Sequence, residues 1–105
     1  MERRAKVEST LLDINLGMAA IYLTISGDGI PTQKFGGTFC SKPLEIIGNM
    51  LDICNAASWE DMPGKEILVS VEDGKVTYIK RLDHTIMIRS FEHVTISDIV
   101  KFKER

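Results

Sequence analysis

The first forty residues alternate between apolar and polar side chains in the manner of β-strands. Because a strand points successive side chains to opposite faces, a period of two predicts a half-buried strand. The alternation is clearest in residues 18–26, whose apolar face would carry Ala19, Ile21, Leu23 and Ile25. It also occurs in residues 6–16. A third strand is expected in residues 32–40, after a glycine- and proline-containing loop over residues 27–31 that cannot continue a ladder.

The pattern changes to a helical period after this third strand. Ser41 and Pro43 suit a helix start, because a hydroxyl can cap the first turn and proline is tolerated in it. An apolar stripe follows, formed by Leu44, Ile47, Met50, Leu51 and Cys54 and widened by Ile46, Ile53 and Ala57. The opposite face would carry Glu45, Gly48, Asn49, Asp52 and Asn55. The sequence therefore predicts an amphipathic helix over about residues 43–57 that packs on a sheet.

Strand periodicity returns after the punctuation at Pro63-Gly64. Residues 66–72 alternate, Asp73-Gly74 is a strong two-residue hairpin signal, and residues 76–82 form the returning strand. Asp83-His84 resembles a second tight connection before a strand that includes Ile86 and Ile88. The tail over residues 95–102 fits either a short helical turn or a final strand.

These elements define an α+β fold, with one helix on an antiparallel sheet of about six strands in the order β-β-β-α-β-β-β. A length of 105 residues predicts one compact domain over residues 1–105. The chain has no apolar run long enough for a membrane span, and its charged start leads into no apolar block of a signal peptide. The expected location is therefore cytoplasmic.

The charge is small overall but unevenly distributed. The formal net charge is −2. Acidic residues dominate residues 60–73, and basic residues dominate from Lys75 onward. This pattern is typical of a solvated sheet face with cross-strand charge pairs. A nucleic-acid groove would need more basic residues and interleaved exposed aromatics, so the sequence disfavours a nucleic-acid partner.

The residues that most often bind metals have no metal-site spacing in this chain. Cys40 and Cys54 are interpreted as reduced thiols that fill the core. Together with His84 and His93 they lack the short pairwise spacing that zinc sites use. We therefore expect neither a metal nor a cofactor.

The segment Phe35-Gly36-Gly37 is the most unusual part of a predicted strand. Adjacent glycines weaken a strand unless something approaches the bare backbone closely. A bulge would explain them, as would the helix or an aromatic ring packed against the backbone. The functional alternative is a ligand or partner peptide laid against this segment, with Asp28 and Gly29 in the preceding loop as a rim. All five residues are candidate binding residues.

The second candidate segment is Trp59-Glu60-Asp61, which follows the helix. Trp59, the only tryptophan, is expected to plug the corner of the fold. Glu60 and Asp61 are loop acids that could also contact a partner or a cation. Two-metal chemistry needs further carboxylates, for which Asp52 is the nearest candidate. No serine or cysteine lies in a nucleophile motif, so the sequence favours a protein without catalytic residues.

The order of these motifs resembles a group of small phage- and prophage-encoded proteins whose function is not settled. The resemblance covers residues 6–80, through Phe35-Gly36-Gly37, the helix, and Ser58-Trp59-Glu60-Asp61 followed by Gly64-Lys65. The chain departs from that group at Pro31-Thr32-Gln33-Lys34, where the group is glycine-rich, and at Thr38, where it has an aromatic residue. The C-terminal strands from Gly74 to Val100 are similar to the small barrel of YolD-like proteins.

The resemblance implies a mobile-element context, in which short proteins commonly bind and block host machinery. The leading hypothesis is a non-enzymatic binding protein inside a bacterial host, acting as an inhibitor of host defence. One alternative is a module that sequesters a small nucleotide-type ligand, and another is a small metal-assisted hydrolase that uses Glu60 and Asp61. Unpaired sheet edges also favour homo-oligomers, unless charges such as Lys34 or Lys80 guard those edges.

Overall fold

The computed structural model describes residues 2–15, 18–39, 43–89 and 99–101. In chain order its elements are β1 (Glu2–Asn15), β2 (Met18–Gly27), β3 (Ile30–Phe39), α1 (Pro43–Cys54), β4 (Glu66–Glu72), β5 (Lys75–Lys80), β6 (Ile86–Arg89) and β7 (Ile99–Lys101). One turn of 3-10 helix, Trp59–Asp61, lies between α1 and β4. The predicted α+β class and the order of strands around one helix are confirmed at this level. The tail contributes a strand at β7, and the rest of it lies outside the described residues.

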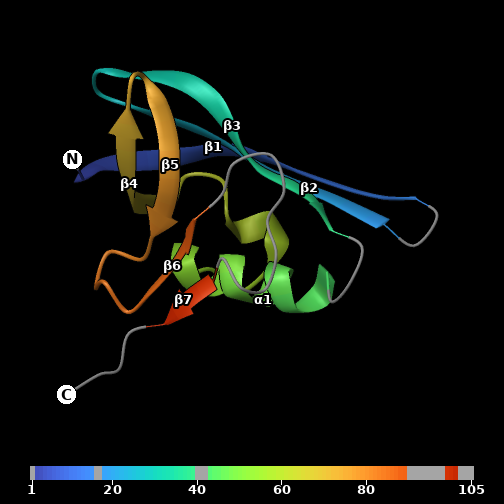
Figure 1. The fold of residues 1–105 in the computed structure, drawn as a ribbon. Coiled ribbons are helices and arrows are strands. Elements are labelled where there is room, and N and C mark those ends of the chain that lie inside the picture. Colours follow the sequence, from blue (N-terminus) through green and yellow to red (C-terminus); the bar gives the residue numbers. More distant parts are fainter. Residues whose placement is uncertain (1, 16–17, 40–42, 90–98, 102–105) are drawn as a thin grey trace.

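All strand pairings in the described sheet are antiparallel, in the spatial order β3-β2-β1-β4-β5-β6-β7. The sheet curls around α1, which lies against its concave face (Figure 1). The curl brings β3 close to β5, and the Gln33 side chain links them by two hydrogen bonds, which we call the clasp. Its Nε2 donates to the Gly74 carbonyl at 3.0 Å, and its Oε1 accepts from the Val76 N–H at 2.7 Å. A side-chain amide thus replaces a backbone ladder at this seam.

The concave face of the sheet and one side of α1 form the core. The apolar face predicted for β2 is fully buried, as are side chains from β1, β4, β5, β6 and the helix; the largest include Ile21, Leu23, Ile25, Ile46, Met50, Ile53, Ile67, Ile79 and Ile88. The predicted helix stripe was partly wrong, because Leu44 is 79% exposed whereas Asn49 is buried. The Asn49 Nδ2 donates to the Glu45 carbonyl at 2.7 Å, so its burial leaves that amide paired.

The helix ends earlier than its apolar pattern predicted. Asn55 has a φ of 54°, in the left-handed region. Its N–H donates to the Asp52 carbonyl, and the Ala56 N–H donates to the Leu51 carbonyl. These two bonds form a Schellman motif, in which asparagine is an accepted substitute for glycine. The predicted extension of the helix through Ala57 was therefore wrong.

The two predicted hairpin connections in the second half are confirmed. Asp73 and Gly74 both have positive φ, and Glu72 pairs with Lys75 across a two-residue turn. His84 also has a positive φ and donates its N–H to the Arg81 carbonyl, which turns the chain between β5 and β6.

Strand β1 passes through two different environments. Glu2 to Lys6 pair with β4 on one side, and the pairing with β2 runs from Lys6 to Asn15. A bulge between Val7 and Ser9 marks the change. Val7 still bonds the loop before β4, because its N–H donates to the Lys65 carbonyl and its carbonyl accepts from the Gly64 N–H. From residue 8 onward, β2 is the only strand beside β1 in the described part of the chain.

Candidate functional site

The three residues predicted at Phe35-Gly36-Gly37 belong to the packed interior of the fold. Phe35 is 4% exposed and joins the core. Gly36 has a φ of 149°, and a Cβ placed there would lie 1.9 Å from the Ile21 carbonyl oxygen. The close approach that the glycines predicted therefore occurs, but with the backbone of β2 rather than with the helix or an aromatic ring. The bulge in this strand pair lies between Ile25 and Gly27 instead.

The predicted rim, Asp28 and Gly29, forms the exposed turn between β2 and β3. Gly29 has a φ of 74°, which favours glycine. The turn lies against the beginning of β1, since Arg3 Nη1 donates to the Gly29 carbonyl at 3.4 Å. Both residues are accessible to a partner, whereas Phe35, Gly36 and Gly37 are buried.

The second predicted segment also divides into a structural and an exposed part. Trp59 is half-buried and packs against the core, as expected for a corner plug. Glu60 and Asp61 are exposed on the 3-10 turn. Asp52, the predicted third carboxylate, instead forms an ion pair with Arg81 at 2.5 Å. Among the residues that the structure describes, no group of three or more His, Cys, Asp and Glu side chains is arranged to hold a metal ion.

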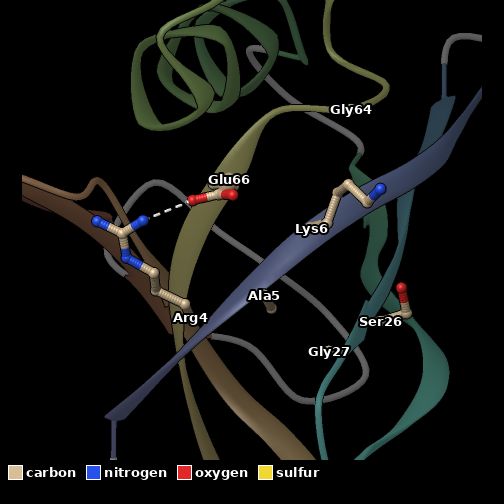
Figure 2. Close-up of a pocket in the computed structure, with 7 residues that line it drawn as sticks. All are labelled: Arg4, Ala5, Lys6, Ser26, Gly27, Gly64 and Glu66. Carbon is tan, nitrogen blue, oxygen red and sulfur yellow. Dashed lines mark hydrogen bonds and ion pairs between the residues drawn. The ribbon is translucent and has the colours of Figure 1, made fainter.

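Between these two segments lies an open pocket of about 350 Å³. Figure 2 shows its lining, which comes from the first half of β1, the end of β2, the loop before β4 and the start of β4: Arg4, Ala5, Lys6, Ser26, Gly27, Gly64 and Glu66. The position follows from strand register, because Lys6 lies opposite Ser26 on one side and Glu66 on the other. The Lys6 side chain is on the face opposite the core, since the neighbouring Ala5 and Val7 are buried.

The charged groups of this pocket differ in whether they have an ion-pair partner among the described residues. Arg4 Nη1 forms an ion pair with Glu66 Oε1 at 2.7 Å, and both groups face solvent. Ser26 Oγ donates to the carboxylate of Glu8, just beyond the lining. The Lys6 side chain has no hydrogen-bond or ion-pair partner among the described residues. The pocket therefore presents one uncommitted cation beside a neutralised pair.

Sequence reasoning did not identify the residues of this pocket. It did select its two flanks, since Gly27 leads into the predicted Asp28–Gly29 rim and Gly64 follows the Trp59–Asp61 turn. The alternation in β1 places Arg4 and Lys6 on one face, but only the register with β2 and β4 shows what surrounds them.

A second polar cluster gathers around Glu2 on the same face of the sheet. Glu2 Oε2 accepts hydrogen bonds from Lys80 Nζ at 2.6 Å and from Tyr78 Oη at 2.5 Å, and His84 Nδ1 lies 3.8 Å from Oε1. The hydrogen bond from Lys80, followed by that from Tyr78, lowers the pKa of Glu2. Burial and then the bond to Glu2 raise the pKa of Tyr78 to about 12. The carboxylate is thus occupied by donors that belong to the fold.

Cys54, which sequence analysis predicted to be a reduced core thiol, is free and buried. Burial raises its pKa to about 12, so the thiol stays protonated near neutral pH and is a poor nucleophile. Cys40 and His93 lie outside the described residues. No helix in the described part of the chain has the length and apolar character needed to cross a membrane.

Comparisons with family models, with curated proteins and with solved structures found no match to this chain. The site is therefore interpreted from its own geometry.

Proposed function

We propose that this protein is a non-enzymatic binding protein and that it captures its partner at the pocket around Lys6. The observation that carries the proposal is the Lys6 ammonium, which has no partner in the described part of the chain and lies in an open pocket beside the Arg4–Glu66 pair. An exposed cation of this kind suits a carboxylate or another anionic group on the partner. The exposed Asp28–Gly29 turn and the acidic pair Glu60 and Asp61 would contact the rim of such a partner.

The biological setting of the proposal comes from the resemblance to small phage- and prophage-encoded proteins. In that setting the partner is a host protein, the protein acts inside the bacterial cell, and the consequence of binding is inhibition of host defence. A small single domain that occupies a surface of a larger protein needs no chemistry of its own to block it.

The disposition of reactive groups favours binding over catalysis. The groups with clearly displaced pKa values are held by neighbours within the fold or are buried, as Glu2, Tyr78 and Cys54 show. The metal-assisted hydrolase alternative would depend on Glu60 and Asp61. If that alternative holds, Glu60→Ala and Asp61→Ala will each abolish the phenotype of the protein in its host, whereas the binding proposal expects partial effects.

The pocket also favours a second candidate function, which is sequestration of a small anionic ligand such as a nucleotide. Its volume of about 350 Å³ lies near the lower end of the range of roughly 300–1,000 Å³ found for small-molecule sites. Lys6 and Arg4 would then contact phosphate oxygens, at the cost of the Arg4–Glu66 pair. Native mass spectrometry of protein purified from its host separates the candidates, because only sequestration predicts a retained small molecule.

The charge reversal Lys6→Glu tests the proposed site directly. The Lys6 side chain is exposed and has no partner among the described residues, so the variant should fold normally yet lose the partner protein. Lys75→Glu is the matched control, since Lys75 is an exposed lysine at the β4–β5 turn. Affinity purification from host lysate, read by quantitative mass spectrometry, should show a partner enriched by the wild type and by Lys75→Glu, and depleted at least tenfold with Lys6→Glu. Equal recovery by all three proteins would reject this placement of the site.

A further inference from the structure

Among the residues that the structure describes, no strand pairs with the part of β1 beyond its bulge on the side away from β2, and this part carries exposed apolar side chains. We define the arm as residues 8–15 of β1 together with residues 18–25 of β2, and the free edge as the side of residues 8–15 that faces away from β2. Figure 1 shows this hairpin extending past the beginning of β4, whose first residue, Glu66, lies opposite Lys6. Leu11 is 46% exposed, Leu12 38% and Ile14 65%. An exposed apolar edge is a template for another strand, and natural proteins usually protect such edges.

The apolar side chains of the arm lie on a defined face. Leu12 pairs with Ile21, and Ile14 pairs with Ala19. Directly opposed residues of an antiparallel pair leave the sheet on the same face, and both β2 residues are buried in the core. Leu12 and Ile14 therefore extend the core face beyond the part that is covered. A strand added at the free edge would cover them further.

We propose that the free edge pairs with the free edge of a second copy of this chain, giving a two-fold dimer with a continuous sheet. When two identical strands pair antiparallel about a two-fold axis in a continuous sheet, the core faces of both copies lie on the same side of that sheet. This is possible only if one residue lies opposite the same residue of the second copy. Only registers centred on residues near the middle of the free edge use most of its length. Leu11, Leu12 and Asp13 are the three possible centres.

Sterics and charge distinguish these three registers. A register centred on Leu11 places Asn15 of the second copy beside Val7, whose N–H and carbonyl already bond Lys65 and Gly64. A register centred on Asp13 places two carboxylates directly opposite each other, which is destabilising.

The register centred on Leu12 avoids both conflicts. It places Leu12 against Leu12 of the second copy and Thr10 against Ile14, all on the core face, while Asp13 lies opposite Leu11. The strand of the second copy then lies on the same side of β1 as β4, next to the part of β1 that β4 does not reach. In this register the segment pairs with itself, placing leucine against leucine and keeping the two Asp13 carboxylates apart, which favours a second copy over an unrelated strand.

Sedimentation velocity of the full chain tests the dimer, with Leu12→Asp as the disrupting variant. The matched control is Leu82→Asp, because Leu82 is also a surface leucine with 39% exposure, in the β5–β6 connection. We expect the wild type and Leu82→Asp to be dimers at micromolar concentration, and Leu12→Asp to dissociate at least tenfold more readily while retaining its circular dichroism spectrum. A monomeric wild type, or a dimer equally stable in Leu12→Asp, would overturn the proposal.

Cysteine cross-linking tests the register and remains informative if Leu12→Asp folds poorly. Opposed residues in antiparallel strands are about 4.5–5.5 Å apart at Cα, within the range that a disulfide spans. Under mild oxidation, Leu12→Cys should form a covalent dimer, whereas Ile14→Cys and the wild type, with its native cysteines, should not. Equal cross-linking of both variants, or cross-linking only through Ile14→Cys, would reject the two-fold register centred on Leu12.

Discussion

The two halves of β1 show how neighbouring strands change the surroundings of side chains along one continuous strand. From Glu2 to Lys6, strands lie on one or both sides and outward side chains meet charged partners, as in the Arg4–Glu66 and Glu2–Lys80 pairs. Beyond the bulge, β2 alone accompanies β1 in the described chain, and the outermost side chains include Leu11 and Ile14. The backbone conformation is extended in both halves.

The difference teaches that the described residues supply neighbours on both sides of the first half of β1, taken together, but only on the β2 side of the second half. Cross-strand charge pairs in the first half each contribute little stability, but they leave few uncommitted groups. In the arm, the described residues supply no such neighbours to the exposed apolar side chains or to the N–H and carbonyl groups of the free edge. Binding through the arm would therefore bury surface that the fold itself leaves exposed.

The largest expected effect is on the strand pair that supports the arm. Gly36 pairs with Tyr22, and a Cβ at Gly36 would lie 1.9 Å from the Ile21 carbonyl oxygen at a φ that only glycine adopts readily. Gly36→Ala should lower the free energy of unfolding by about 3 kcal/mol or more, or prevent folding. Urea denaturation followed by circular dichroism measures the change.

Gly48→Ala is the matched control for that substitution. Gly48 is exposed on α1, and beyond its chain neighbours and the helix's own backbone no atom of the described residues lies within 4 Å of a Cβ placed there. Because alanine is the better helix former, this variant should be more stable by about 0.5–1 kcal/mol. Equal destabilisation by both alanines would contradict the close approach of β2 and β3.

A smaller effect is expected at the clasp that joins the arm's side of the sheet to β5. Gln33→Ala removes the hydrogen bonds to Gly74 and Val76 and leaves two backbone groups without these partners. The free energy of unfolding should fall by about 1–3 kcal/mol. Hydrogen exchange at the Val76 amide should accelerate more than exchange within β1.

Gln33→Glu refines this prediction. The carboxylate keeps an acceptor for the Val76 N–H but cannot donate to the Gly74 carbonyl. Its loss of stability should lie between those of the wild type and Gln33→Ala at neutral pH. A result as severe as Gln33→Ala would show that the donor to Gly74 dominates the clasp.

The smallest effect is expected in the charged half of β1. The folded pKa of Glu2 is lowered, chiefly by the hydrogen bond from Lys80, so the ionised form stabilises the fold. This contribution is present above the unfolded pKa of about 4.3 and is lost as the pH falls through the folded pKa. Glu2→Gln should cost at most about 1 kcal/mol at pH 7, as for other solvent-facing pairs.

Denaturation of the wild type and Glu2→Gln at pH 7 and pH 3 checks the sign. Their difference should shrink as the solution becomes acidic. Glu60→Gln, at an exposed residue with no ion pair in the described part of the chain, should match the wild type at both pH values. A gap between wild type and Glu2→Gln that widens in acid would contradict the assigned role of Lys80.

The local pattern predicted the elements better than their relationships. Alternation located the buried face of β2, and Asp73-Gly74 located a hairpin, because both signals depend on adjacent residues. The end of α1 was missed because the apolar stripe continues to Ala57, whereas Asn55 stops the helix through a backbone motif.

The pocket and the clasp depend on residues far apart in the sequence. Lys6 acquires its surroundings from β2 and β4, and Gln33 from the β4–β5 turn. The partners of Gln33 lie 41 and 43 positions away in the sequence, so periodicity did not identify it. Register and sheet curvature supply this information, and a single sequence does not encode them in any local pattern.

The position of Trp59 has a practical consequence for following these events. As the only indole, packed against the core and far in sequence from the arm, it makes intrinsic fluorescence a reporter of the core. Tyr22, on the arm, and Tyr78, on β5, are the only phenol rings, and both are weaker emitters. Excitation at 295 nm will therefore report on core unfolding, whereas opening of the hairpin alone should remain optically silent.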